Sequence, residues 1–198
     1  MAKRLFDLAA AVLGLVLLGP LLLAVAAWIK LDSPGPVFFR QERVGRYGVP
    51  FRIHKFRTMS HAPSTDGPQI TVGADTRITR AGAFLRQAKL DELPQLIDVL
   101  LGRMSIVGPR PEVPRYVAIY PPELRDKVLS VRPGITDFAS IQFRDESALL
   151  AQSADPEREY TEVVMPAKLR LAAQYVDQAT LATDLRLIGR TLKALVAK

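Results

Sequence analysis

The sequence lacks cysteine and contains only two histidines, His54 and His61. Without cysteine there are no disulfide bonds and no thiolate metal sites, and two histidines are too few for a histidine metal cluster. The chain also has no GxSxG motif, no P-loop, no internal repeat and no low-complexity tail. These absences remove the usual signatures of serine hydrolases and P-loop nucleotidases.

Negative charge is scarce in the N-terminal part of the chain. The formal net charge is +7, and residues 1–57 hold nine Lys or Arg against three Asp or Glu, whereas the remainder is nearly balanced. A basic excess beside a hydrophobic segment suits anionic lipid headgroups. Because the basic residues are not interleaved with stacking aromatics, the composition predicts no nucleic-acid binding.

A long hydrophobic run without charge extends from Leu8 to Ile29. Its 22 residues are enough for a helix to span a bilayer. Three alternatives fit the run: a signal peptide cleaved after residues 24–26, a spanning helix, or a re-entrant helix that breaks at Pro20 and leaves on the side it entered. Cleavage is disfavoured because the apolar run continues beyond the cleavage site and Asp7 interrupts the basic n-region.

Basic residues flank both ends of this run, with Lys3 and Arg4 before it and Lys30 after it. Positive residues prefer the cytoplasmic side, so both ends are expected there, which favours the re-entrant helix. The break is expected at Gly19-Pro20, because proline removes one helical hydrogen bond and permits a kink. The spanning helix and the signal peptide stay open on this evidence.

The pattern of the whole chain predicts a mostly helical α+β protein. Its length allows one domain with an appendage, here a membrane helix over 1–32 and a globular domain over 33–198. A short β-hairpin is expected across residues 46–48, and the Ser-, Thr- and Pro-rich residues 60–76 are expected to form a loop. Helices are expected near 78–88, 91–101, after Pro122, and over 156–177 and 180–196. The last is amphipathic and suits either a core position or a membrane interface.

Two adjacent carboxylates, Asp91 and Glu92, precede an apolar helical run in the stretch KLDELPQLIDVLLG. One interpretation is capping, because acidic residues suit the first turn of a helix. The other is functional, because the same position holds phosphate groups well and carboxylates can bind Mg²⁺ or attack phosphorus.

Several basic residues lie on stiff turns. Arg110 stands between two prolines in SIVGPRPE, and Arg132 stands beside Pro-Gly in SVRPGIT. Arginine on a rigid loop suits bidentate phosphate recognition, although each residue alone is typical of a surface salt bridge. Together with the carboxylate pair they predict a phosphate-bearing substrate near the bilayer. The candidate phosphate ligands are Lys55, Arg57, Arg110, Arg132 and Arg144.

Seven stretches in a fixed order resemble the bacterial sugar transferases, the monotopic phosphoglycosyl transferases that begin glycan assembly on a polyprenol phosphate. They are KRLFDL, FFRQERVG, HKFRTM, RITRAGAFLR, LDELPQL, MSIVGPRPE and VRPGIT, and they cover most of residues 3–144. Each stretch alone is weak, but their joint occurrence is highly specific.

The resemblance implies a re-entrant helix and a catalytic domain with interfacial amphipathic helices, on the cytoplasmic face of the bacterial inner membrane. The enzyme would move a sugar-1-phosphate from a UDP-sugar to undecaprenyl phosphate and release UMP by a ping-pong mechanism. Asp91 would be the nucleophile, Glu92 would act as a base or help organise Mg²⁺, and both would be metal ligands. Anionic lipids are implied as partners, and a homodimer is compatible.

The chain departs from the family pattern at several positions. Gly19 replaces the usual Ser before proline, Arg103 replaces a common Asp, and residues 137–140 replace Gly-Trp-Ala-Gln. Two other functions stay open: a membrane phosphohydrolase that uses the same aspartate with water as acceptor, and a secreted basic binding protein if the N-terminus is cleaved.

Overall fold

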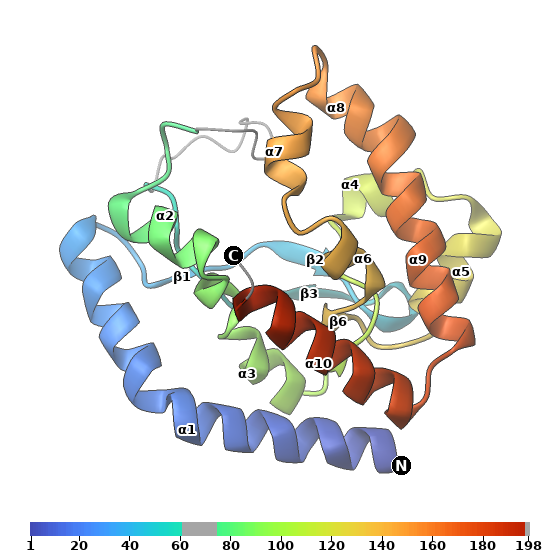
Figure 1. The fold of residues 1–198 in the computed structure, drawn as a ribbon, viewed down its shortest axis with the longest axis horizontal. Coiled ribbons are helices and arrows are strands. Elements are labelled where there is room, and N and C mark those ends of the chain that lie inside the picture. Colours follow the sequence, from blue (N-terminus) through green and yellow to red (C-terminus); the bar gives the residue numbers. More distant parts are fainter. Residues whose placement is uncertain (61–74, 197–198) are drawn as a thin grey trace.

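The computed structural model describes residues 1–60 and 75–196, and most of the expected loop over 60–76 lies outside them. The fold is mostly helical with a few short strands, as predicted (Figure 1). The longer helices are α1 (Ala2–Asp32), α2 (Arg80–Gln87), α3 (Gln95–Leu100), α5 (Pro122–Leu129), α9 (Met165–Asp177) and α10 (Leu181–Val196). The strands are β1 (Phe38–Phe39), β2 (Glu42–Val44), β3 (Pro50–Arg52), β4 (Lys55–Phe56), β5 (Ser105–Val107) and β6 (Gly134–Thr136).

Helix α1 contains 31 residues, with Pro20 inside it, and is long and apolar enough to cross a membrane. Its ribbon bends part-way along (Figure 1). The buried residues lie towards the two ends, Asp7 and Ala11 in the first part and Val25 and Ile29 in the last. Most large apolar side chains between them are exposed. The helix therefore packs on the rest of the molecule near both ends and presents an apolar middle to the surroundings.

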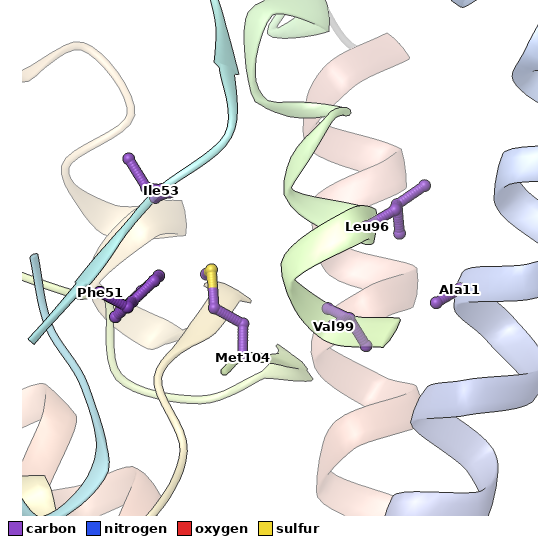
Figure 2. Packing of buried hydrophobic residues seen from close by; sticks show 6 residues of the cluster. All are labelled: Ala11, Phe51, Ile53, Leu96, Val99 and Met104. Carbon is purple, nitrogen blue, oxygen red and sulfur yellow. The ribbon is translucent and has the colours of Figure 1, made fainter. Parts of the chain in front are cut away.

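Helix α3 lies at the centre of one hydrophobic core. Figure 2 shows it between α1, which contributes Ala11, and the strand segment that contributes Phe51 and Ile53. Leu96 and Val99 of α3 belong to the same cluster. This packing places α3, which directly follows the turn with the two carboxylates, between α1 and the segment that contains Phe51 and Ile53.

The predicted hairpin across residues 46–48 is confirmed. Strands β2 and β3 pair antiparallel, with Arg43 opposite Phe51. Tyr47 and Gly48 both have a positive φ, which turns the chain back sharply and which glycine adopts without cost. An outer pair, β1 with β4, continues the arrangement and places Lys55 opposite Phe39.

Strands β5 and β6 form a short parallel pair, with Ser105 opposite Gly134. The sequence had suggested only a rigid loop and a turn over these two stretches; the loop with Arg110 and the turn with Arg132 are present, but residues 105–107 and 134–136 beside them are strands. The pair depends on close backbone approach, since a Cβ on Gly134 would lie 2.0 Å from the backbone nitrogen of Gly108. Glycine at this crossing is therefore a packing requirement.

The C-terminal helices agree with the predicted ranges. Helix α8 (Pro156–Glu159), a π-helical segment η3 (Tyr160–Val164) and α9 follow one another without a break. Helix α10 buries Asp184 and Leu187 but leaves four leucines exposed. One face is thus docked on the protein while another stays apolar and open. Three short helices were not predicted: α4 (Pro114–Val117), α6 (Phe138–Gln142) and α7 (Glu146–Leu150).

Candidate active site

Asp91 lies in the 3₁₀ turn η2 (Leu90–Glu92), just before α3. The preceding Lys89 has φ 54°, a left-handed conformation that is costly for a residue with a side chain and that recurs at functional sites. Asp91 is only 2% exposed, and its Oδ2 accepts from Nζ of Lys55 at 2.8 Å. Its Oδ1 is buried and has no hydrogen-bond partner among the described residues. One carboxylate oxygen is therefore anchored and the other is left with free lone pairs.

The capping interpretation of the carboxylate pair is wrong in this structure. Helix α3 starts at Gln95 with Pro94 in the cap position, and no side chain caps it. The two carboxylates instead face cationic side chains that come from elsewhere in the chain.

Glu92 is held by Arg110 and Lys55. Arg110 donates from Nη1 to Oε2 at 3.0 Å and from Nη2 to Oε1, while Nζ of Lys55 lies 3.3 Å from Oε1. Burial acts to raise the pKa of Glu92, but the charges of Arg110 and Lys55 outweigh it and hold that pKa well below its ordinary value. Glu92 in turn raises the pKa of Arg110. Glu92 is therefore ionised, and it lies directly beside the carboxylate of Asp91.

Lys55 joins the two carboxylates. It lies in β4, far from residues 91 and 92 in sequence, and its one ammonium group reaches both. Two neighbouring anions would otherwise repel each other and favour protonation of one. The structure thus brings together Lys55, Asp91, Glu92 and Arg110, four of the residues selected from sequence.

The other three candidate phosphate ligands lie elsewhere. Arg57 is buried and donates to the carbonyls of residues 29, 33 and 34 at the end of α1. Arg132 donates to the carbonyl of Gly102, beyond the opposite end of α3. Arg144 donates to the carbonyl of Ala194 in α10. In the part of the chain that the structure describes, all three side chains donate to backbone carbonyls.

Sequence reasoning missed three residues near the pair. Burial lowers the pKa of Arg86 in α2, and the nearby charge of Asp91 opposes this shift. The charge of Lys89 helps lower the pKa of Glu92. Gln95, one turn after Asp91, is 1% exposed, and its Oε1 has no partner among the described residues. The conspicuous stretches RITRAGAFLR and LDELPQL contain Arg86 and Gln95, but nothing in their spacing indicates these roles.

A second buried network supports the loop of Arg110. Glu112 accepts from Nη1 of Arg43 at 3.1 Å and from the hydroxyl of Tyr160 at 2.6 Å. Burial, with the charge of Glu112, raises the pKa of Tyr160, so this hydroxyl stays protonated and donates. A small cavity beside Arg110 is lined by Tyr120, Tyr160 and Lys168, among others. The loop that presents Arg110 is thus held by the Glu112 network on one side and borders this small cavity on another.

The residues present fit a magnesium ion that is shared with a substrate. Among the described residues no cluster of three His, Cys, Asp or Glu could hold a metal alone. Mg²⁺, however, commonly binds one or two carboxylates and completes its shell with waters and substrate phosphates. The unpartnered Oδ1 of Asp91 is suited to this, whereas Glu92 would have to exchange part of its contact with Arg110.

Comparison with known proteins gives a consistent family. The family model described as bacterial sugar transferase matches residues 1–198. A UDP-glucose:undecaprenyl-phosphate glucose-1-phosphate transferase of Caulobacter vibrioides is 40% identical over 98% of this chain and 69% of its own length. A UDP-N-acetylgalactosamine-undecaprenyl-phosphate N-acetylgalactosaminephosphotransferase of Aeromonas hydrophila is 45% identical over 70% of this chain.

The relatives differ in length. The match spans 33% of the Aeromonas protein and 38% of a UDP-glucose:undecaprenyl-phosphate glucose-1-phosphate transferase of Xanthomonas campestris, which is 41% identical. The chain therefore corresponds to about a third of these longer proteins. Both the full-length match to the family model and the Caulobacter relative lead to one conclusion: the chain belongs to the bacterial sugar transferase family.

Proposed function

We propose that the protein transfers a sugar-1-phosphate from a UDP-sugar to undecaprenyl phosphate and releases UMP. The observation that carries this proposal is the buried carboxylate of Asp91, with one oxygen held by Lys55 and the other unpartnered. The names of the relatives describe the same reaction for glucose and N-acetylgalactosamine donors. The sugar used by this chain is left open.

The reaction proceeds in two displacements. In the first, Oδ1 of Asp91 attacks the β-phosphorus of the UDP-sugar. A new P–O bond forms to the carboxylate as the bond to the bridging oxygen breaks, and UMP leaves. In the second, an oxygen of undecaprenyl phosphate attacks the same phosphorus, and the carboxylate of Asp91 leaves unchanged. This is a ping-pong cycle through a phosphosugar-aspartyl intermediate.

The cations of the site offset the charge of the reacting phosphates. Positioning and charge neutralisation dominate in phosphoryl transfer. Lys55 and Arg110 are paired with carboxylates, and the diphosphate of the substrate supplies anions that compete for them. Glu92 then becomes available as a base or to help organise a metal. Arg57, Arg132 and Arg144 stay predicted phosphate ligands, and in the structure their guanidinium groups donate to backbone carbonyls.

Magnesium fits this scheme through Glu92 and a second lone pair of Asp91, since the lone pair of Oδ1 that attacks phosphorus has to stay unoccupied. When bound, it would polarise the phosphate oxygens and neutralise charge on the leaving group. The protein's own contribution is to keep Glu92 ionised and to leave Oδ1 of Asp91 without a hydrogen bond from the described residues.

The contacts of α1 support a re-entrant helix. At its start, Nη1 of Arg4 donates to the carbonyl of Val99 at 2.7 Å and Lys3 pairs with Asp184 at 2.8 Å. At its end, Arg57 donates to the carbonyl of Ser33 at 2.8 Å. A spanning helix would separate its ends by the hydrocarbon thickness, roughly 30 Å, on opposite faces. Polar ties from both ends to one globular body favour an arrangement in which both ends stay on that body's side.

This arrangement places the protein on one face of the membrane. The exposed middle of α1 would enter the lipid, and the open leucine face of α10 would lie at the interface. Basic residues near both ends of α1 would contact anionic headgroups and indicate the cytoplasmic face of the inner membrane. The division into a membrane helix over 1–32 and a catalytic domain over 33–198, and a homodimer, are kept as proposals.

Intact-protein mass spectrometry tests the chemistry. The purified protein is incubated with Mg²⁺ and each of a panel of UDP-sugars, without lipid. We expect a mass gain of one sugar phosphate, absent in Asp91→Asn. Glu157→Gln is the matched control, because this carboxylate pairs with Tyr116 and Arg115 away from the carboxylate pair. An adduct that persists in Asp91→Asn would refute the assignment of the nucleophile.

The acceptor is tested on the same protein. Undecaprenyl phosphate should discharge the adduct and yield the lipid-linked diphosphate sugar. Release of free sugar phosphate, unchanged by the lipid, would instead support the phosphohydrolase alternative.

The absence of cysteine gives a clean background for mapping α1. We expect single cysteines in Ala2→Cys and Ser33→Cys to react with an impermeant thiol reagent from the same side of sealed vesicles. Replacement of Pro20 should straighten the helix and reduce the fraction of protein in which both positions are labelled from the same side. Labelling from opposite sides in the protein with Pro20 intact would refute the re-entrant helix.

A further inference from the structure

A buried carboxylate on α3, that of Asp98, binds His54, the residue that precedes Lys55. Asp98 is 0% exposed. Its Oδ2 accepts from the backbone N–H of His54 at 2.7 Å, and its Oδ1 lies 2.8 Å from Nδ1 of the same histidine. Both carboxylate oxygens thus accept hydrogen bonds from His54, one from its main chain and one from its ring, while Nη1 of Arg103 lies farther from Oδ1, at 3.8 Å.

The other ring nitrogen of His54 fixes which tautomer is present. Nη1 of Arg40 lies 2.7 Å from Nε2, and Nη2 of Arg40 donates to the carbonyl of Arg52 at 2.9 Å. A guanidinium can only donate, so Nε2 must accept. The proton of a neutral ring is then on Nδ1, where it is donated to Asp98. Only one neutral tautomer satisfies all of these partners.

The same two chain segments meet again at the carboxylate pair. Lys55 follows His54 directly, and its ammonium reaches Oδ2 of Asp91 at 2.8 Å. Asp98 follows Asp91 on the segment formed by η2 and α3. The strand segment and the helix segment are therefore joined at two places, His54 to Asp98 and Lys55 to Asp91, which fixes how one lies against the other.

We propose that His54 and Asp98 are positioning residues that hold Lys55 against Asp91, and that Arg40 selects the histidine tautomer on which this depends. The functional part of this inference rests on the proposed role of Asp91 as nucleophile. The tautomer of His54 and the clamp, by which we mean the two hydrogen bonds from His54 to Asp98, are properties of the protein without substrate.

The hydrogen-bond pattern makes the clamp sensitive to a nearly isosteric change. In Asp98→Asn only one side-chain atom can accept, so the amide group would face a donor, either the backbone N–H or Nδ1–H of His54. The ring could relieve this by moving its proton to Nε2, but that proton would then face Arg40. Arg40→Met removes this second conflict, so the double variant can regain a satisfied arrangement.

Nitrogen-15 NMR of histidine-labelled protein in nanodiscs tests the tautomer. The chain has only two histidines, so His61→Asn leaves the signals of His54 alone. We expect the proton on Nδ1 in otherwise unaltered protein and on Nε2 in the variant that carries both Asp98→Asn and Arg40→Met. A proton on Nε2, or on both nitrogens, in the unaltered protein at neutral pH would overturn the proposal.

Steady-state kinetics test the consequence for Lys55. We expect Asp98→Asn to lower kcat by about tenfold to a hundredfold with a smaller change in KM for the UDP-sugar. Adding Arg40→Met should recover most of that loss, which a purely destabilising effect would not do. Rates are compared well below the unfolding midpoints of all variants, with Glu157→Gln as an acid-to-amide control.

The outcomes separate the two proposals. An unaltered protein that transfers no sugar phosphate, yet shows the expected tautomer, refutes the proposed function and leaves the clamp in place. An active protein whose kcat is unchanged by Asp98→Asn, or whose loss is not recovered by Arg40→Met, overturns the positioning role while the proposed function stands.

Discussion

The contact between Arg110 and Glu92 leads to a quantitative prediction for Arg110→Met. Methionine keeps much of the side-chain volume but removes the cation that donates to both oxygens of Glu92. Glu92 would then be a largely buried anion whose remaining partner at this distance is Lys55 at 3.3 Å. The variant should therefore be less stable at neutral pH.

The expected magnitude follows from the exposure of the pair. Breaking a fully buried ion pair costs about 3–5 kcal/mol. Here the Arg110 side chain is 33% exposed and that of Glu92 15%, and Lys55 remains, so we expect a loss of about 2–3 kcal/mol. For a chain of this size, that loss corresponds to a fall of about 5–10 °C in the melting temperature.

The stability difference between Arg110→Met and the unaltered protein should depend on pH in a defined direction. The folded pKa of Glu92 lies well below its ordinary value of 4.5, so its ionised form stabilises the folded state above that value. This stability is lost as the pH falls from about 4.5 towards the folded pKa. In Arg110→Met the burial of Glu92 is less well compensated and its folded pKa rises. The stability gap between the two proteins should therefore narrow below about pH 4.5.

Thermal unfolding monitored by circular dichroism in detergent, at pH 7.5 and pH 3.5, measures both effects. Arg125→Met serves as a control, because Arg125 pairs with Asp126 on an exposed surface and should change little. An unchanged melting temperature at pH 7.5, or an equal gap at both pH values, would show that the pair does not stabilise the ligand-free site.

Three further substitutions have direct expectations. Asp91→Asn should reduce sugar-phosphate transfer by at least about 10⁴-fold while circular dichroism shows a folded protein, because it removes the nucleophile but keeps the shape. Arg57→Leu should lower the free energy of unfolding by about 2–4 kcal/mol, measured by denaturant titration, since several carbonyls at the end of α1 lose a charged donor. Gly82→Ala should lower the melting temperature, because its Cβ would lie 1.9 Å from the carbonyl oxygen of Thr58, whereas Gly189→Ala has open space and should not.

The site could be predicted from sequence only in part, and the failures have a physical cause. Lys55 and Arg57 are two residues apart, so a continued strand would place both side chains on one face. The strand β4 ends at Phe56, however, and the two side chains separate. Lys55 reaches the carboxylates, whereas Arg57 turns to α1 and fixes its end. Residue type and spacing predicted cations, but the end of a two-residue strand decided their roles.

Non-local pairing explains the elements that were missed. The strands β5 and β6 have three residues each, which is too short for an alternating pattern to stand out, and their partners are distant in sequence. The bonds between His54 and Asp98 are equally distant and leave no periodic signal. By contrast, the hairpin across residues 46–48 and the amphipathic helix α10 are local patterns, and both were found.

The charges at the carboxylate pair favour binding of a divalent cation together with the donor. Asp91 and Glu92 are balanced by Lys55 and Arg110, so these four groups have no net charge. The diphosphate of a UDP-sugar brings two negative charges into this neutral set, and a Mg²⁺ ion would restore the balance. Without the metal, removing one carboxylate charge should therefore favour donor binding.

Calorimetric titration of a UDP-sugar in the presence of EDTA tests this reasoning. Glu92→Gln should bind the donor about tenfold more tightly than the unaltered protein, because a negative charge near the diphosphate is removed, worth about 1.4 kcal/mol. With excess Mg²⁺ the order should reverse, since the variant has lost a candidate metal ligand. The same affinity order in both conditions would show that Glu92 does not link the metal to the donor, and the charge balance would then have to come from Arg86 or Lys89.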